Sequence, residues 1–175
     1  ITCDTFRNTG MLNIGGSVTT DSLYNSGMLE LGGCLTADVI KNSGMFTIGS
    51  DVTSDSITNS GLITIKGNLT ADNAELGGAF NILGDITADS ILITLNDAEC
   101  KAECIKADSL IVTNRMGKAG SFLVIKSAEI ENGTLVNVKA DYVKMESGTV
   151  GEGCVIKRLE CGDGVTISPS TKILS

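Results

Sequence analysis

Five glycines near the start of the chain recur with a fixed 17-residue period: Gly10, Gly27, Gly44, Gly61 and Gly78. An aspartate recurs with the same period from Asp4 to Asp89, and a threonine from Thr2 to Thr87. A period this short excludes helical-hairpin repeats, because two helices with their turns need about 33 to 47 residues. It suits one coil of a β-solenoid, in which each coil packs on the next and no coil folds alone.

Each repeat alternates between apolar and polar residues, as strands with one buried side do. In residues 35–48 we expect these apolar side chains to face inward: Leu35, Ala37, Ile40, Phe46 and Ile48. We expect the intervening polar side chains to face outward, including those of Thr36, Asp38, Lys41 and Thr47. The alternation resets at Gly44 and around Gly49, which predicts corners of the coil there. Repetition gives four interior columns, which begin at Phe6, Leu12, Ile14 and Val18.

The period loosens after residue 92, although one short pattern persists. Ala107–Asp108 in IKADSL and Ala140–Asp141 in VKADYV repeat the step of a small inward residue followed by an outward acid. The interval from Lys106 to Lys139 is close to two coils. Residues 114–120 (NRMGKAG) are predicted to form a bulging loop, because glycine and polar residues interrupt the strand pattern.

These patterns predict an all-β fold, a single-stranded parallel β-helix in one domain covering residues 1–175. Residues 1–92 form the regular 17-residue repeats, and residues 93–175 form less regular coils. The length divided by the period gives about ten coils. The right-handed preference of crossovers between parallel strands predicts a right-handed solenoid.

Composition limits the classes of partner and the cellular locations that suit this chain. The net charge of −8 argues against a nucleic-acid partner, because phosphate binding needs clustered lysine and arginine. No window approaches the roughly 18 uninterrupted apolar residues of a membrane span, and no signal peptide is visible. The chain starts at Ile1, so a fragment, a trimmed chain and a mature chain all remain open. Six cysteines are too few for a disulfide scaffold, which predicts reduced thiols and a cytoplasmic location.

The sequence predicts no catalytic, cofactor-binding or metal-binding residues, and therefore no enzyme. The chain has no histidine, the usual general acid–base residue and a usual member of nucleophile triads. It also has no phosphate-binding loop motif. Cys100 and Cys104, together with Cys154 and Cys161, lack the spacings of ordinary zinc sites. We expect these four cysteines to be packing residues.

Two polar columns have structural interpretations. The asparagine column is expected to form a ladder of stacked amides, because asparagine tolerates tight turns and its amide both donates and accepts; its members are Asn8, Asn25, Asn42 and Asn59. The aspartate column is expected to cap backbone amides or stay solvated. Calcium-binding β-rolls carry several acids in each turn, whereas this column supplies one acid per repeat.

Met11, Met28 and Met45 form a column just after the corner glycines, continued by Leu62 and Ala79. By alternation this column points outward, and a contiguous apolar stripe on a rod commonly marks a contact surface. The opposite interpretation is that the corner turns these side chains inward. The sequence leaves both open.

The glycine-punctuated repeats, the recurrent Thr-Ala-Asp step and the missing catalytic residues resemble the bactofilins. The similarity continues in residues 151–173, GEGCVIKRLECGDGVTISPSTKI. In that family a Gly-Cys-x-Ile phrase precedes a short aliphatic strand and a closing x-Val-x-Ile strand. The resemblance implies a right-handed β-helix that forms filaments without nucleotide, stacking end to end, often beneath the membrane, with roles in cell shape.

The resemblance also implies where copies meet. The family's polymer contacts involve the terminal coils, which here correspond to Phe6, Leu12 and Ile14 at one end and to Val165, Ile167 and Ile173 at the other. The family often has an apolar N-terminal tail for membrane attachment, but this chain begins directly in a coil. Membrane association would therefore involve partners or a missing tail.

The sequence supports a non-enzymatic, self-assembling cytoskeletal protein whose main partner is another copy of itself. Independently of the family, a solenoid end exposes unpaired strand edges and a slice of apolar core, which must be capped or paired. The alternative function is a cell-surface adhesin, or a carbohydrate-binding β-helix module, that presents a Thr/Asn-rich face. A signal peptide before Ile1 would favour the adhesin.

Overall fold

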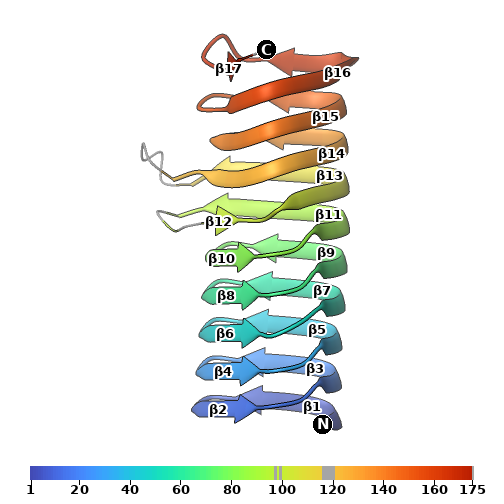
Figure 1. The fold of residues 1–175 in the computed structure, drawn as a ribbon, viewed down its shortest axis with the longest axis vertical. Coiled ribbons are helices and arrows are strands. Elements are labelled where there is room, and N and C mark those ends of the chain that lie inside the picture. The colour runs from blue at the N-terminus through green and yellow to red at the C-terminus, as the bar shows by residue number, and fades with distance from the viewer. Residues whose placement is uncertain (97, 99, 116–120, 175) are drawn as a thin grey trace.

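The computed structural model describes residues 1–96, 98, 100–115 and 121–174, and it shows a rod of stacked β-coils (Figure 1). The chain climbs the rod one coil at a time, so the N- and C-terminal ends lie at opposite ends. The described residues contain strands and no helix, and the strands join in a single parallel sheet of about ten turns. The predicted all-β solenoid is therefore confirmed.

In the regular half, each coil contributes one long strand and one short strand. The long strands are β1 (Thr2–Asn8), β3 (Val18–Asn25), β5 (Leu35–Asn42), β7 (Val52–Asn59) and β9 (Leu69–Leu76). The short strands are β2 (Met11–Ile14), β4 (Met28–Leu31), β6 (Met45–Ile48), β8 (Leu62–Ile65) and β10 (Ala79–Ile82).

The second half has longer strands that bend around the coil. They are β11 (Ile86–Leu95), β13 (Cys104–Asn114), β14 (Leu123–Leu135), β15 (Val138–Val150) and β16 (Val155–Ile167), with the short β12 (Cys100–Lys101) and β17 (Lys172–Ile173). Of the predicted loop at residues 114–120, Asn114 ends β13 and Arg115 is exposed, whereas residues 116–120 lie outside the described residues.

Parallel pairing at the interval of the repeat stacks equivalent residues directly on one another. Ile40 pairs with Ile57, and Ile48 with Ile65. All four side chains are fully buried, which confirms the predicted inward register. The threonine and aspartate columns are exposed in every coil from Thr2 to Asp89, as predicted.

A third corner lies inside each long strand, where no glycine marks it. In β5, Leu35 and Ala37 are buried, Asp38 and Val39 are not, and Ile40 and Asn42 are buried again. The inward phase therefore shifts between Asp38 and Val39, which gives each coil three inward-facing stretches instead of two. In the sequence, the apolar residues Ala37 and Ile40 are three positions apart instead of two, which breaks the alternation. No glycine stands at this corner, whereas glycines indicate the other two.

The predicted alignment of IKADSL with VKADYV is wrong. Lys106 pairs with Glu129, and Glu129 pairs with Lys144, so one coil is longer than the regular repeat and the next is shorter. Ala140 instead pairs with Ile125 and Ile156, on the side of the rod that continues the short strands. The step of a small inward residue followed by an outward acid is a property of any half-buried strand, so it does not identify the side of the coil.

The asparagine column is a buried amide ladder, as predicted. Asn25 donates from Nδ2 to Oδ1 of Asn42 at 2.8 Å, and Asn42 donates in the same way to Asn59 at 2.8 Å. Asn42 also donates to the carbonyl oxygens of Gly44 (3.2 Å) and Leu62 (3.1 Å). Each amide thus binds the corner of its own coil to the next coil. Leu76 takes the ladder position after Asn59.

We predict that Asn42→Ala lowers the free energy of unfolding by about 2–3 kcal/mol, because it leaves buried polar groups on Asn25, Asn59 and Leu62 without their partner. The matched control is Asn73→Ala, an exposed asparagine in β9, which should change stability by less than about 0.5 kcal/mol. Urea unfolding followed by circular dichroism measures both. Equal effects in the two variants would contradict a structural role for the ladder.

Candidate assembly surfaces

The N-terminal coil exposes side chains that are buried in every regular coil above it. Leu12 is 39% exposed, whereas Leu29, its partner in the next coil, is 1% exposed. Phe6 and Ile14 are partly buried and pack against the end of the core. The predicted contact residues at this end therefore form an open slice of the apolar column.

Gly10 provides a second sign of an open end. A Cβ atom added at Gly27 would overlap the carbonyl oxygen of Gly10, because successive corner glycines bring the two backbones together. A Cβ atom added at Gly10 would meet nothing within 4 Å. Among the described residues, β1 pairs only with β3 and β2 only with β4, so the outer edges of both strands carry no strand partner.

The C-terminal coil is open in the same way. Ile167 is 39% exposed, and Val150, its partner one coil earlier, is fully buried. Ile173 is 40% exposed, although Ile156 beneath it is fully buried. Val165 is partly buried against the core. The structure therefore brings each predicted set of three residues to one end of the rod.

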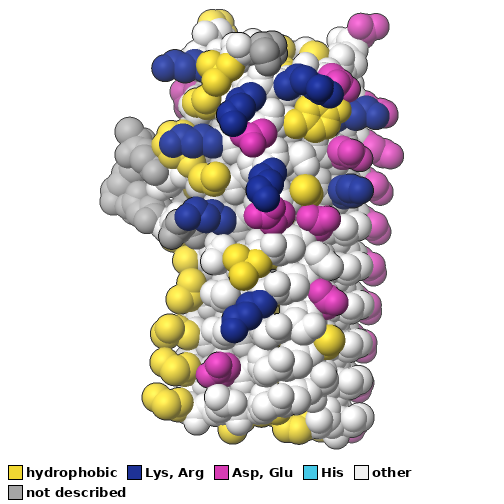
Figure 2. All heavy atoms as spheres, in the orientation of Figure 1, with side chains coloured by type: hydrophobic (Ala, Val, Ile, Leu, Met, Phe, Trp, Pro, Cys, Tyr) yellow, Lys and Arg dark blue, Asp and Glu magenta, His cyan; other side chains and the backbone are white. Residues whose placement is uncertain are grey.

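The methionine column points outward, so the interpretation that the corner turns it inward is wrong. The exposed fractions are 81% for Met11, 41% for Met28, 48% for Met45 and 38% for Leu62. Each pairs with the equivalent residue of the next coil, which makes the stripe continuous over four coils. Figure 2 shows it as a column of hydrophobic side chains along the left edge of the lower half of the rod.

The cysteines considered as zinc ligands do not converge. Cys100 pairs with Leu123, Leu123 pairs with Val138, and Cys154 lies one coil further in the same buried column. Three coil steps separate these two thiols by about 14 Å. Cys161 is exposed and pairs with Met145 on another side of the coil. Within the described residues, no three His, Cys, Asp or Glu side chains are arranged to hold a metal ion.

A polar cluster that the sequence pattern does not indicate lies at a corner of the second half. Glu160 accepts hydrogen bonds from the Tyr142 hydroxyl (2.9 Å) and from Arg158 (2.7 Å), and the guanidinium lies over the Tyr142 ring, 4.7 Å from its centroid. The hydrogen bond from Tyr142 lowers the pKa of Glu160, and the same bond raises the pKa of Tyr142. Because all three side chains are solvent-accessible, the cluster contributes little to stability.

Alternating charges line a groove of about 310 Å³ on the outer side of the second half. Lys106, Glu129 and Lys144 follow one another across paired strands, and Glu160 comes next. Asp108 and Glu146 also line the groove. Opposite charges on neighbouring strands stabilise the sheet locally, whereas Asp108 and Glu146 belong to a row of stacked acids beside them. Its register depends on the irregular coil lengths, so the sequence pattern did not reveal it.

No protein-family model matches this chain, and no curated protein or solved structure matches it either. In the described part of the chain, no helix has the length and apolar character that a membrane span requires. Evidence for a function therefore comes from the surfaces of the rod.

The cysteines provide a direct test of which side chains face inward and which face outward. Burial raises the pKa of the Cys154 thiol, which lowers the reactive thiolate fraction at neutral pH. We predict that iodoacetamide labels the exposed Cys34 and Cys161 in the native protein, and labels Cys100 and Cys154 at least about tenfold more slowly. Mass spectrometry of timed digests measures each site. Rapid native labelling of Cys100 would contradict its place in the core.

Proposed function

We propose that the protein is a non-enzymatic structural element that assembles end to end into filaments without nucleotide, as its resemblance to the bactofilins implies. The observation that carries the proposal is the pair of open apolar ends, Leu12 at 39% and Ile167 at 39% exposure, on a rod whose interior columns are buried in the coils between the ends. The proposed location is the cytoplasm, with membrane association through partners or a tail outside this sequence.

End-to-end stacking follows from the same forces that join one coil to the next. A terminal coil that meets another copy buries its apolar slice and pairs its strand edges, as internal coils do. The open space at Gly10 supports this argument, because internal corner glycines occupy the corresponding place against a neighbouring backbone. A rod that joined another copy in this way would continue the parallel strand pairing and the apolar core from one copy to the next, with no new type of contact.

A second candidate is carbohydrate binding by a surface β-helix. One groove of about 330 Å³ favours it, because Tyr24 lies there among serine, threonine and asparagine side chains. However, Arg7 covers the Tyr24 ring, 4.8 Å from its centroid, which takes up a ring face on which a sugar would stack. We therefore favour assembly over glycan binding.

We predict that Gly10→Ala leaves the monomer folded but blocks end-to-end assembly, because the added methyl group occupies the place that the neighbouring copy's backbone would take. Gly27→Ala is the matched control: its methyl group collides with the backbone inside the rod, so it should destabilise the fold itself. Negative-stain electron microscopy scores filaments, and circular dichroism scores folding. The assay contains EDTA and no nucleotide, because the proposed assembly needs neither metal nor nucleotide.

Two charged variants separate end contacts from the methionine stripe. Ile167→Lys places an ammonium in the apolar end contact, where it would be desolvated and unpaired, so it should shorten or abolish filaments. Met28→Lys should leave filament length unchanged if the ends alone make the contact, and should disrupt assembly if the stripe makes it. Filaments of normal length from Gly10→Ala and Ile167→Lys, both correctly folded, would refute end-to-end stacking.

A further inference from the structure

The proposed end contacts do not explain the methionine stripe, which consists of Met11, Met28, Met45 and Leu62. The stripe runs along the rod over four coils, whereas an end contact covers only a terminal slice. The other outward position of the same short strands is polar in each of these coils. A contiguous apolar stripe with polar rims is typical of a surface that binds another molecule.

The rows on either side of the stripe carry opposite charges. The row before the corner, which we call the basic flank, contains Arg7, Tyr24, Lys41 and Thr58. The row after the stripe, which we call the acidic flank, contains Asn13, Glu30, Thr47 and Thr64. Arg7 lies over the Tyr24 ring, and Glu30 accepts a hydrogen bond from Asn13 at 3.0 Å. Arg7, Lys41 and Glu30 are nevertheless exposed, so their charges face solvent beside the stripe.

These charges fit a second copy that lies parallel to the first. A two-fold axis parallel to the rods places the basic flank of each copy beside the acidic flank of the other. In register, Glu30 of one copy lies in the same coil level as Tyr24 of the other. The second copy's Arg7 and Lys41 then lie one coil below and one coil above Glu30, about 4.8 Å away along the axis. The symmetry makes this contact twice, so four cations flank two acids.

An antiparallel pair matches the charges less well. A two-fold axis across the rods places each flank against itself. Centred on the third coil, it would bring Arg7 to Glu75, which follows Thr58 in the basic flank. It would also place Lys41 against Lys41 and leave Glu30 without a cation. Because like charges in contact are unfavourable, the parallel arrangement is favoured.

The length of the stripe favours one register. Apolar contact is greatest when all four stripe positions face their equivalents in the second copy. A shift by one coil would leave Met11 of one copy and Leu62 of the other uncovered.

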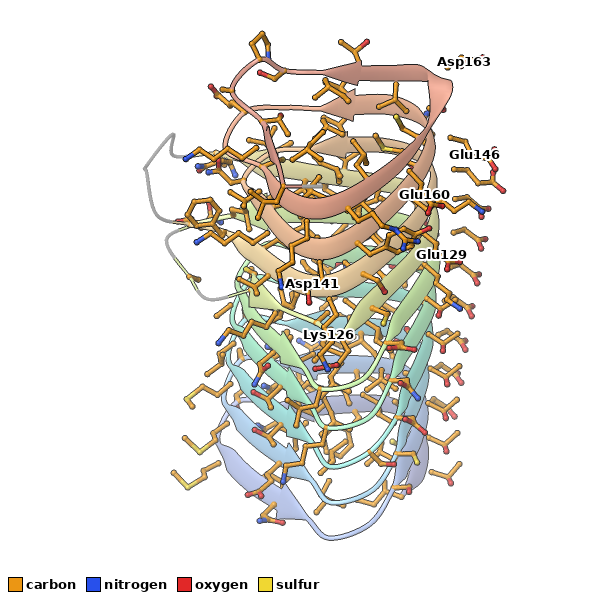
Figure 3. The ribbon with its side chains drawn as sticks, turned by 45° about the horizontal axis from the view of Figure 1, so that its top comes forward. Lys126, Glu129, Asp141, Glu146, Glu160 and Asp163 are labelled. Carbon is orange, nitrogen blue, oxygen red and sulfur yellow. The ribbon has the colours of Figure 1, made fainter. Side chains whose placement is uncertain are left out.

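A row of stacked acids lies on the opposite edge of the rod from the stripe. The row starts at Asp4, and after Asp89 the strand pairings continue it through Asp108, Glu131 and Glu146. Figure 2 shows acidic side chains along the right edge and the stripe along the left edge. Figure 3 shows Glu146 on the side of the carboxylates, and sulfur-bearing side chains projecting from the other side of the lower half. Pairing through the stripe therefore keeps the two acidic rows apart.

We propose that two copies bind side by side through the methionine stripe, parallel and in register, with the basic flank of each copy against the acidic flank of the other. Four coils span about 14 Å of the axis, so the contact is small and a single pair is weak. Rods that also stack end to end would repeat the contact in every subunit, which strengthens it. The lateral contact goes beyond the proposed end-to-end assembly and uses none of its residues.

Covalent trapping tests the orientation of a weak pair. Met28→Cys and Met45→Cys are each introduced into a chain that carries Cys34→Ser and Cys161→Ser, because Cys34 and Cys161 are exposed. With a short bismaleimide, each variant should form covalent pairs at least about tenfold faster than the control Thr36→Cys, because thiols held face to face have a high effective concentration. Thr36 is exposed outside the stripe and its flanks. An antiparallel pair can place at most one of the two stripe positions against itself.

Charge reversal tests the flanks. Arg7→Glu together with Lys41→Glu should slow the cross-linking of Met45→Cys by at least about tenfold, because Glu30 then faces acids. Adding Glu30→Lys should restore the rate, which a variant that had merely lost its fold would not show. Lys66→Glu is the matched control, because Lys66 is an exposed lysine of the same half outside both flanks.

Several results would overturn the proposal. They are self-cross-linking at only one stripe position, rates equal to that of Thr36→Cys, and no recovery with Glu30→Lys. Binding of the stripe only to phosphatidylcholine vesicles, without covalent pairs, would overturn it as well. Ile167→Lys separates the lateral contact from end-to-end stacking, because rods that no longer stack should still cross-link through the stripe. Loss of cross-linking in that variant would contradict an independent lateral contact.

Discussion

Backbone hydrogen bonding between successive coils is the constraint on which the rest of this structure depends. It places each residue directly on its equivalent one coil away, so in the regular half most side chains meet a residue of the same kind. Isoleucine on isoleucine buries apolar surface, as in the column through Ile40 and Ile57. Asparagine on asparagine makes a hydrogen bond, as between Asn25 and Asn42. Aspartate on aspartate repels, and such columns remain on the outside.

Much of the regular half can be predicted from the sequence, because the fixed period identifies which residues pair in successive coils. Ile40, Ile48 and Ile65 are buried where the period places them. The second half resists the same argument, because coils of unequal length shift the alignment by amounts that no motif records. The misplaced Ala140 shows this limit: a pattern shared by all half-buried strands cannot tell one side of a coil from another.

Some surface features can likewise be predicted from the sequence, and others need the structure. The open ends, represented by Leu12 and Ile167, follow from the sequence because any solenoid exposes its terminal coils. The sequence alone did not decide whether Met28 points outward, because a residue next to a corner can face either way, and only the structure shows that it is exposed. The alternating charges of Lys106, Glu129 and Lys144 could not be predicted, because these residues lie in coils of unequal length and become neighbours only when the strand register is known.

The unequal coils have a consequence for the dimensions of the rod. The interval from Lys106 to Glu129 is longer than the regular repeat, yet both residues lie in directly paired strands, whose spacing is set by backbone hydrogen bonding. Axial length is therefore counted in coils and not in residues. An insertion between two strands can therefore leave the axial spacing of the coils unchanged. Positions along the rod stay at fixed intervals, whatever the number of residues in each coil.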